Sequence, residues 1–105
     1  MDQALREQVE STLSANEVVL FMKGSRMFPQ CGFSAKVVEI LKSLQVPFKD
    51  VNIFADPALR DGMKEFSEWP TFPQLYVRGQ FIGGCDIVSD LYEKGELEQL
   101  LRPSA

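Results

Sequence analysis

Two cysteines, Cys31 and Cys85, are the residues of this chain best suited to chemistry, and the chain contains no histidine. A cysteine thiolate is both a nucleophile and a soft metal ligand. Because histidine is absent, Ser-His and Cys-His catalytic pairs, His-ligated zinc or haem, and imidazole acid–base catalysis are excluded. Two cysteines also fall short of the four protein ligands of a structural zinc site. They are too few for a disulfide-rich secreted domain, so a reducing compartment is expected.

Cys31 occupies the setting expected of a reactive thiolate. The preceding segment, residues 23–30, reads as a loop because it contains Gly24 and Pro29, and a helical pattern begins at Cys31. At a helix N-terminus, unpaired backbone N–H groups and the positive end of the helix dipole lower a cysteine pKa. Lys23 adds a second positive influence if its strand ends beside that helix. The alternative, an inert buried cysteine, agrees less well with this loop setting.

The first half of the chain supplies the elements that must position Cys31. Asp2 is the expected cap of a helix that ends near Asn16, with an apolar residue every four positions: Leu5, Val9 and Leu13. Residues 18–22 form a continuous apolar run, typical of a strand buried on both faces. The helix from Cys31 is expected to be stopped by Pro47. Its apolar residues are Val37, Val38, Ile40, Leu41 and Leu44, and the strand that follows contains Phe48, Val51 and Ile53. Two strands joined by a helix should be parallel.

The residue pattern in the second half of the chain predicts a helix, a hairpin and two more helices. Asp56-Pro57 is a cap followed by proline at the first helical position, and the buried stripe comprises Leu59, Met63 and Phe66. Residues 74–78 and 81–82 form the expected hairpin, joined by Gly79-Gln80. Asp86 is the expected cap of the next helix, whose apolar residues are Ile87, Val88, Leu91 and Tyr92. Gly95 separates this helix from a last helical turn that contains Leu97, Leu100 and Leu101. The order α-β-α-β-α-β-β-α-α predicts an α/β thioredoxin fold with a four-stranded mixed sheet flanked by helices.

Length and charge limit the remaining possibilities. The 105 residues, 45% hydrophobic and 25% charged, suffice for one modest core, so we expect a single domain over 1–105 with its core in about 3–102. The net charge of −4 predicts a field that repels nucleic acid and anionic membranes. No apolar run approaches the roughly 18 residues of a membrane-spanning helix. We therefore expect partners other than nucleic acid or membrane.

Four motifs, in the right order and fold positions, resemble the monothiol glutaredoxin family: Lys23, Cys31-Gly32-Phe33-Ser34, Trp69-Pro70-Thr71-Phe72-Pro73 and Gly83-Gly84-Cys85-Asp86. The resemblance extends from about residue 5 to residue 101 and is greatest to the single-domain members of chloroplasts and mitochondria. It implies that Cys31 is the catalytic residue and that Ser34 replaces a second, resolving cysteine. By itself, a serine in a first helical turn also serves to bond backbone N–H groups.

The resemblance further implies a glutathione site formed by Lys23, Arg60, Lys64, Phe72, Cys85 and Asp86. Without it, Arg60 and Lys64 read as a solvated helix surface, and Asp86 as a simple helix cap. The family holds the peptide bond before Pro73 cis, although trans is the usual isomer. Cys85 has two readings: a buried filler, which we favour, or a thiol that forms a disulfide with Cys31. Trp69 is either a core residue or a wall of the site.

The resemblance implies a function as well. In the family, a labile [2Fe-2S] cluster is bound by Cys31 from each subunit of a homodimer and by two glutathiones, and is passed to apo iron–sulfur recipient proteins; the apo form is a monomer. A thiol oxidoreductase that removes glutathione from proteins through Cys31, and an adaptor for a BolA-type protein, are the alternatives. The loop over 24–30 is longer than in dithiol relatives, and in this family that length is associated with poor thiol transfer. The expected location is the chloroplast stroma, reached with a removable transit peptide, with the mitochondrial matrix as the alternative.

Overall fold

The four strands form one sheet in the order β2-β1-β3-β4. In this computed structural model, which describes residues 1–102, their bounds are β1 Val18–Met22, β2 Lys49–Asn52, β3 Gln74–Val77 and β4 Gln80–Gly83. β1 is parallel to β2 and antiparallel to β3, and β3 is antiparallel to β4. The sheet is therefore mixed, and β1 is internal, as its continuous apolar run predicts.

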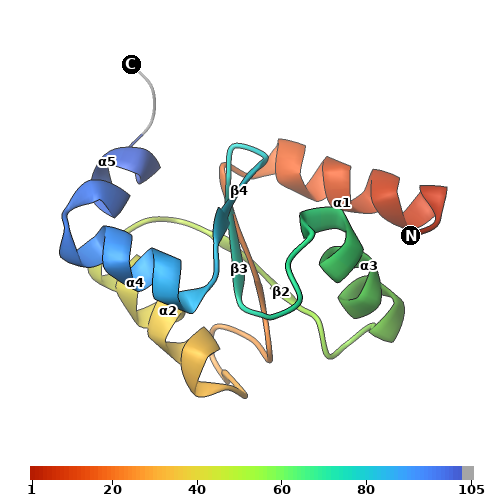
Figure 1. Cartoon of the computed structure of the whole chain (residues 1–105), viewed down its shortest axis with the longest axis horizontal. Coiled ribbons are helices and arrows are strands. Elements are labelled where there is room, and N and C mark those ends of the chain that lie inside the picture. The colour runs from red at the N-terminus through yellow and green to blue at the C-terminus, as the bar shows by residue number, and fades with distance from the viewer. Residues whose placement is uncertain (103–105) are drawn as a thin grey trace.

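Five helices cover the two faces of the sheet (Figure 1): α1 Gln3–Ala15, α2 Gly32–Ser43, α3 Pro57–Ser67, α4 Cys85–Glu93 and α5 Glu96–Leu101. On one face, Leu20 and Met22 of β1 join the apolar side chains of α2, α4 and α5. On the other face, Val19 and Phe21 join those of α1 and α3. Since alternate residues of β1 enter opposite clusters, this strand is buried throughout, and the predicted thioredoxin fold is confirmed.

The end of α2 differs from the prediction that Pro47 stops it. The helix ends at Ser43, and Gln45 adopts a left-handed φ of 57°. The N–H of Gln45 bonds to the carbonyl of Lys42 at 3.0 Å, and the N–H of Val46 to that of Leu41 at 3.1 Å. These two bonds form a Schellman motif, in which the N–H groups of residues just after the helix bond to its last carbonyl groups and so end it. Pro47 follows a helix that has already ended.

Two turns in the second half also lie at other positions than expected. Val77 pairs with Gln80, so the hairpin loop is Arg78-Gly79 and not Gly79-Gln80. Both loop residues have positive φ, 50° and 79°, which gives the loop the backbone twist that tight hairpins favour. The cap of α4 is Gly84 and not Asp86, because the Gly84 carbonyl already accepts the Val88 N–H at 3.0 Å.

Several local predictions are confirmed. The Asp2 carboxylate accepts the N–H of Leu5 at 2.7 Å, and Asp56 caps α3 immediately before Pro57. The second strand is shorter than its apolar pattern, since Phe48 and Ile53 lie just outside its ends.

Within residues 1–102 we find no helix that combines the length and the apolar character needed to cross a membrane.

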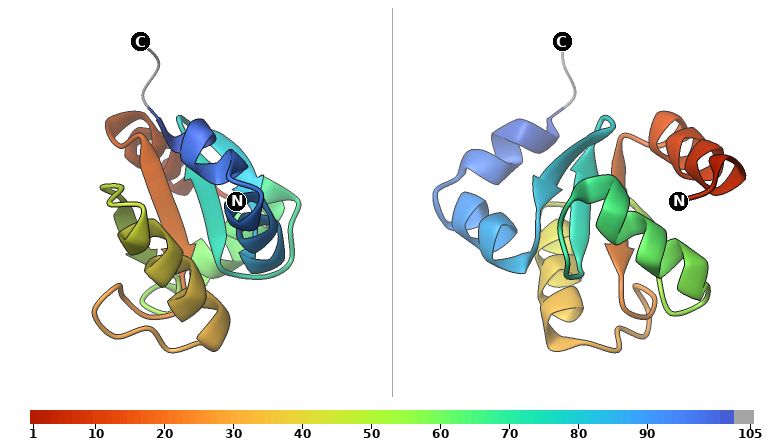
Figure 2. Two further views of the ribbon diagram at one scale, coloured as in Figure 1. Left: turned by 90° about the vertical axis from the view of Figure 1, so that its left-hand side faces the viewer. Right: turned by 45° about the vertical axis from the view of Figure 1, so that its right-hand side comes forward.

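The loop that joins β1 to α2, residues 23–31, projects beyond the end of β1 (Figure 2). Its backbone returns on itself: Gly24 and Pro29 form an isolated bridge, and the N–H of Gln30 bonds to the carbonyl of Lys23 at 2.9 Å. A side chain at Gly24 would place Cβ 2.5 Å from the Phe28 carbonyl oxygen, and φ there is 91°, so the closed loop requires glycine. The loop delivers Cys31 to the start of α2.

Candidate functional site

Cys31 is the capping residue of α2, with extended backbone angles of −153° and 134°, and its side chain is partly exposed. Its pKa lies below the ordinary cysteine value, chiefly because the backbone N–H of Ser34 in the first turn of α2 favours the thiolate. Partial burial opposes the lowering, while the N–H of Phe33, the charge of Lys23 and the Ser34 hydroxyl add to it. The helix-terminus and Lys23 effects predicted from the sequence therefore act on Cys31 in the expected direction.

Ser34 is completely buried in the first turn of α2. Its Oγ accepts the backbone N–H of Lys23 at 3.1 Å, so the side chain ties the end of β1 to the start of α2. This confirms the structural reading of the serine. It also leaves Cys31 without a thiol neighbour in its own helix, because Cys85 is the only other cysteine of the chain.

A groove of about 260 Å³ lies between the end of β1, the start of α2, the segment before β3 and the start of α4. Its lining residues are Lys23, Phe33, Trp69, Thr71, Phe72, Pro73, Gly84, Cys85, Asp86 and Ile87. The Phe72-Pro73 bond is cis, as in the family. The Phe72 ring is buried in the cluster formed with α1 and α3, so its backbone is the part directed to the groove. Phe72 can therefore offer peptide groups to a ligand, in the manner of an added strand.

The structure brings four of the predicted glutathione-site residues to this groove: Lys23, Phe72, Cys85 and Asp86. Arg60 and Lys64 lie outside its lining, on α3, where Arg60 is exposed and Lys64 partly buried. The role of these two in binding glutathione stays a prediction. A larger hollow, of about 700 Å³, lies at the other end of β1 around Val18 and Pro47, and neither cysteine lines it.

Cys85 is the first residue of α4 and is buried, and both cysteines are free thiols in the structure. Its sulfur lies 3.9 Å from Ser89 Oγ, one turn along the same helix. These contacts favour the reading of Cys85 as a buried filler whose backbone meets the groove. Asp86 is exposed in the first turn of α4, where its charge is favourable to the helix dipole.

Close backbone approach shapes the α4 side of the groove. Gly83 has a φ of 154°, and a Cβ there would lie 2.7 Å from the Ile87 side chain. A Cβ on Gly84 would lie 3.3 Å from both the Pro73 carbonyl oxygen and Trp69 Nε1. Trp69 packs on Phe81 with ring centroids 5.9 Å apart and lines the groove, so it serves as a wall.

Sequence reasoning missed three groove residues, Phe33, Thr71 and Ile87, and a cluster around Arg26. Phe33 and Thr71 lie inside the motifs at residues 31–34 and 69–73, so the motif residues beside them could have indicated their place in the groove. No local signal identifies Arg26, because its partners Phe48 and Asp50 are more than 20 positions away.

The family model described as Glutaredoxin matches residues 18–82, which include β1, Cys31, the segment before β3 and most of the hairpin. The chain belongs to the glutaredoxin family. This glutaredoxin is 54% identical over 96 residues to the probable monothiol glutaredoxin 2 of Rickettsia felis, covering 91% of this chain and 92% of the relative. It is 56% identical to the chloroplastic monothiol glutaredoxin-S14 of Arabidopsis thaliana, covering 90% of this chain but 55% of that relative. The chain thus spans about half the length of the plant protein.

Solved structures agree with the fold of this glutaredoxin. The solution structure of reduced poplar apo GrxS14 is 55% identical and superposes with a TM-score of 0.82, covering 90% of this chain and 87% of that one. The buckwheat glutaredoxin–glutathione complex superposes with a TM-score of 0.83 over 96% of this chain and 93% of its own, at 20% identity. The second likeness concerns the fold alone. This chain is a monothiol glutaredoxin, and its family acts with glutathione.

Proposed function

We propose that this monothiol glutaredoxin binds a labile [2Fe-2S] cluster between two copies of the chain and passes it to apo recipient proteins. The observation that carries the proposal is the state of Cys31: a partly exposed thiol at a helix start, with a lowered pKa and with a buried serine where a second thiol would stand. Such a thiolate suits a soft metal centre and has no second thiol in its own helix with which an oxidant would join it in a disulfide.

The donor set fits a shared cluster. A [2Fe-2S] centre takes four ligands, commonly thiolates. The chain has two cysteines and no histidine, and Cys85 is buried against Ser89. One copy therefore offers Cys31 alone, and two copies with two glutathione thiols complete the set. Because Cys31 lies at the surface, the same cluster remains accessible to a recipient.

The groove suits glutathione, which carries two carboxylates, one ammonium and two peptide groups. In this proposal Lys23, with Arg60 and Lys64 from α3, attracts the carboxylates. The backbone N–H groups at the start of α4 form an anion site, and the Asp86 carboxylate accepts from the ammonium. The Phe72 backbone pairs with the cysteinyl unit like an added strand.

A second candidate is thiol transfer, which the lowered pKa of Cys31 favours. The Cys31 thiolate attacks the glutathione sulfur of a mixed disulfide, forming a Cys31–glutathione disulfide and releasing the protein thiolate. A second glutathione thiolate then attacks the adduct, which yields oxidised glutathione and restores Cys31. Because Ser34 cannot resolve the adduct, we expect this activity to be weak.

Partners and location complete the proposal. The apo protein is a monomer and the cluster-bound form a homodimer, with recipient apoproteins and a BolA-type protein as further partners. We place it in the chloroplast stroma because plant relatives in this range of identity are named chloroplastic. The mitochondrial matrix is the alternative.

Anaerobic reconstitution with iron, sulfide and glutathione tests the function. The expected product is a coloured dimer, followed by visible absorption and size-exclusion chromatography. Cys31→Ser should stay colourless, whereas Cys85→Ala should keep the colour because the Cys85 thiol is buried away from solvent. A colourless wild-type monomer that still removes glutathione from a glutathionylated peptide would instead establish the thiol-transfer function.

A further inference from the structure

Large exposed apolar side chains gather beside Cys31. Met27, Phe28 and Phe33 are 71%, 75% and 62% exposed, and we call these three residues the Cys31 rim. All three lie within four positions of Cys31, so their Cα atoms are at most about 14 Å from its own. Exposed aromatic and methionine side chains concentrated around a reactive group are typical of a protein contact surface.

Glutathione does not account for this rim. Met27 and Phe28 lie outside the lining of the groove, which Phe33 alone of the three joins. Glutathione is moreover a polar, charged tripeptide whose groups are matched by cations and backbone amides. Met27 and Phe28 are therefore free to contact a molecule other than glutathione.

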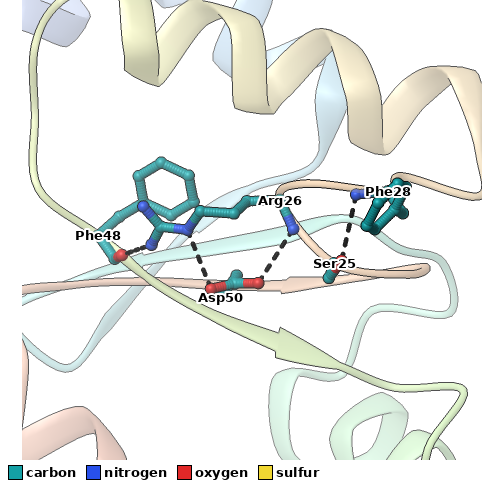
Figure 3. A network of polar contacts seen from close by, with 5 residues as sticks. All are labelled: Ser25, Arg26, Phe28, Phe48 and Asp50. Carbon is teal, nitrogen blue, oxygen red and sulfur yellow. Dashed lines mark hydrogen bonds and ion pairs between the residues drawn. The ribbon is translucent and has the colours of Figure 1, made fainter.

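The loop holding Met27 and Phe28 is anchored to β2 through Arg26 (Figure 3). The Arg26 N–H donates to Asp50 Oδ2 at 3.0 Å, and Arg26 Nε donates to Asp50 Oδ1 at 3.1 Å. The guanidinium also donates to the Phe48 carbonyl oxygen and lies 3.9 Å from the centre of the Phe48 ring. Burial alone would raise the pKa of Asp50, but the hydrogen bonds from Arg26 prevail and lower it. This Arg26 clamp thus joins a charged pair to an aromatic contact.

The tip of the loop is itself a closed turn. The N–H of Phe28 donates to the Ser25 carbonyl at 3.1 Å, and the N–H of Ser25 to the Phe28 carbonyl at 3.3 Å. The rim is therefore presented on an ordered backbone. An ordered surface loses less conformational entropy on binding, which strengthens association.

We propose that the Cys31 rim is the surface on which a second copy of this chain docks in the cluster-bound dimer, and that Arg26 is the residue that positions it. The inference rests on the proposed function, which makes two Cys31 sulfurs ligands of one cluster. The exposed side chains of the Cys31 rim, whose Cα atoms lie within about 14 Å of that of Cys31, are then the apolar groups nearest in sequence to the point where the two copies meet. In a two-fold dimer one patch meets itself, and an apolar patch is complementary to its own copy. Asp50 pairs with Arg26 and so removes a charge that would repel its symmetry mate.

The test compares two surface variants after anaerobic reconstitution with iron, sulfide and glutathione. Met27→Ser/Phe28→Ser removes two rim residues that do not line the groove. Tyr92→Ser is the matched control: Tyr92 is 40% exposed and lies beside Ser43, at the opposite end of α2 from Cys31. The double variant should raise the dimer dissociation constant, measured by sedimentation, by about tenfold or more. The control should equal the wild type.

The outcomes separate this inference from the proposed function. A coloured double variant that dimerises as tightly as the wild type overturns the inference and leaves the function intact. A wild type that gives no coloured dimer overturns both. Glutathione affinity of the apo monomers should be equal in all three proteins, because the substituted side chains lie outside the groove.

The role of the Arg26 clamp is tested by a separate pair of variants. Asp50→Asn keeps the shape of the side chain and removes its charge. The variant should dimerise more weakly than the wild type, as the double variant does. It should also shift the visible circular dichroism of the bound cluster. Asp90→Asn, which breaks the exposed Lys94–Asp90 pair on α4, is the control and should change neither. If Asp50→Asn matches the wild type in both measurements, the Arg26–Asp50 ion pair does not position the rim, and this part of the inference is overturned.

Discussion

Cys31 and Ser34 have separate tasks at the start of α2. Cys31 presents its sulfur to backbone N–H groups that favour the thiolate, whereas Ser34 is buried and fastens the helix to β1. A serine at this position therefore does more than leave out a resolving thiol. It holds the backbone that gives Cys31 its reactivity.

The pH dependence of Cys31 follows from its lowered pKa. Its alkylation by iodoacetamide, followed by mass spectrometry, should rise with a midpoint below the value of about 8.5 for an ordinary cysteine. The folded thiolate stabilises the protein at a pH above the pKa of the unfolded chain, and this contribution is lost as the pH falls through the folded pKa. Lys23→Gln should raise the midpoint, since the charge of Lys23 is one of several causes that lower the pKa of Cys31. Lys94→Gln, at the far end of α4, should leave the midpoint unchanged. A wild-type midpoint no lower than that of the same protein unfolded in urea would contradict the mechanism.

Among the helices and strands, the site depends on a few contacts at which one segment meets another, and we call these contacts joints. The end of β1 meets α2 through the Ser34 hydroxyl, the loop after β1 meets β2 through Arg26, and the turn after α3 meets α4 at Gly84. Each joint is a single side chain or a close backbone contact. The groove therefore depends on a few short-range fits more than on any one helix.

The joint between β1 and α2 can be tested by Ser34→Ala. The substitution leaves the partly buried N–H of Lys23 without an acceptor, so the free energy of unfolding should fall by about 1–3 kcal/mol. Urea unfolding monitored by the fluorescence of Trp69, the sole tryptophan, measures this change. Ser43→Ala on the exposed end of the same helix should cost less than about 0.5 kcal/mol. Equal effects at the two serines would argue against the joint.

The molecule as a whole combines a net charge of −4 with the cation Lys23 near its thiolate. Lys23 lines the groove, and Arg60 and Lys64 lie on α3. The acidic surface opposes general association, while the groove attracts an anionic peptide. In the proposed function, dimerisation depends on ligands that join two copies of the site.

Removal of the glutathione thiol tests this dependence. Reconstitution with S-methylglutathione in place of glutathione should give no coloured dimer, because the methylated peptide fits the groove but cannot supply a thiolate ligand. Desalting a glutathione-loaded dimer should likewise release the cluster and yield monomer, as size-exclusion chromatography and the loss of visible absorption would show. A stable coloured dimer with S-methylglutathione would mean that the second pair of ligands comes from elsewhere.

The sequence by itself determined the element order, the buried centre of the sheet and the placement of Cys31 at a helix start. These features are readable because they depend on side-chain periodicity and on caps formed within one or two turns of chain, as Asp2 and Asp56 show. The family motifs added the groove residues, of which Lys23, Phe72, Cys85 and Asp86 come together.

Contacts between distant segments could be read only from the folded chain. The Arg26 clamp joins residues 22 and 24 positions apart, and it depends on the parallel pairing of β1 with β2. Likewise, α2 ends at a Schellman turn and α4 is capped by Gly84, so backbone hydrogen bonds and not the expected Pro47 and Asp86 set these boundaries. The physical reason is that residue type favours a local conformation, whereas long-range contacts form only when packing of the whole sheet fixes the distance between segments.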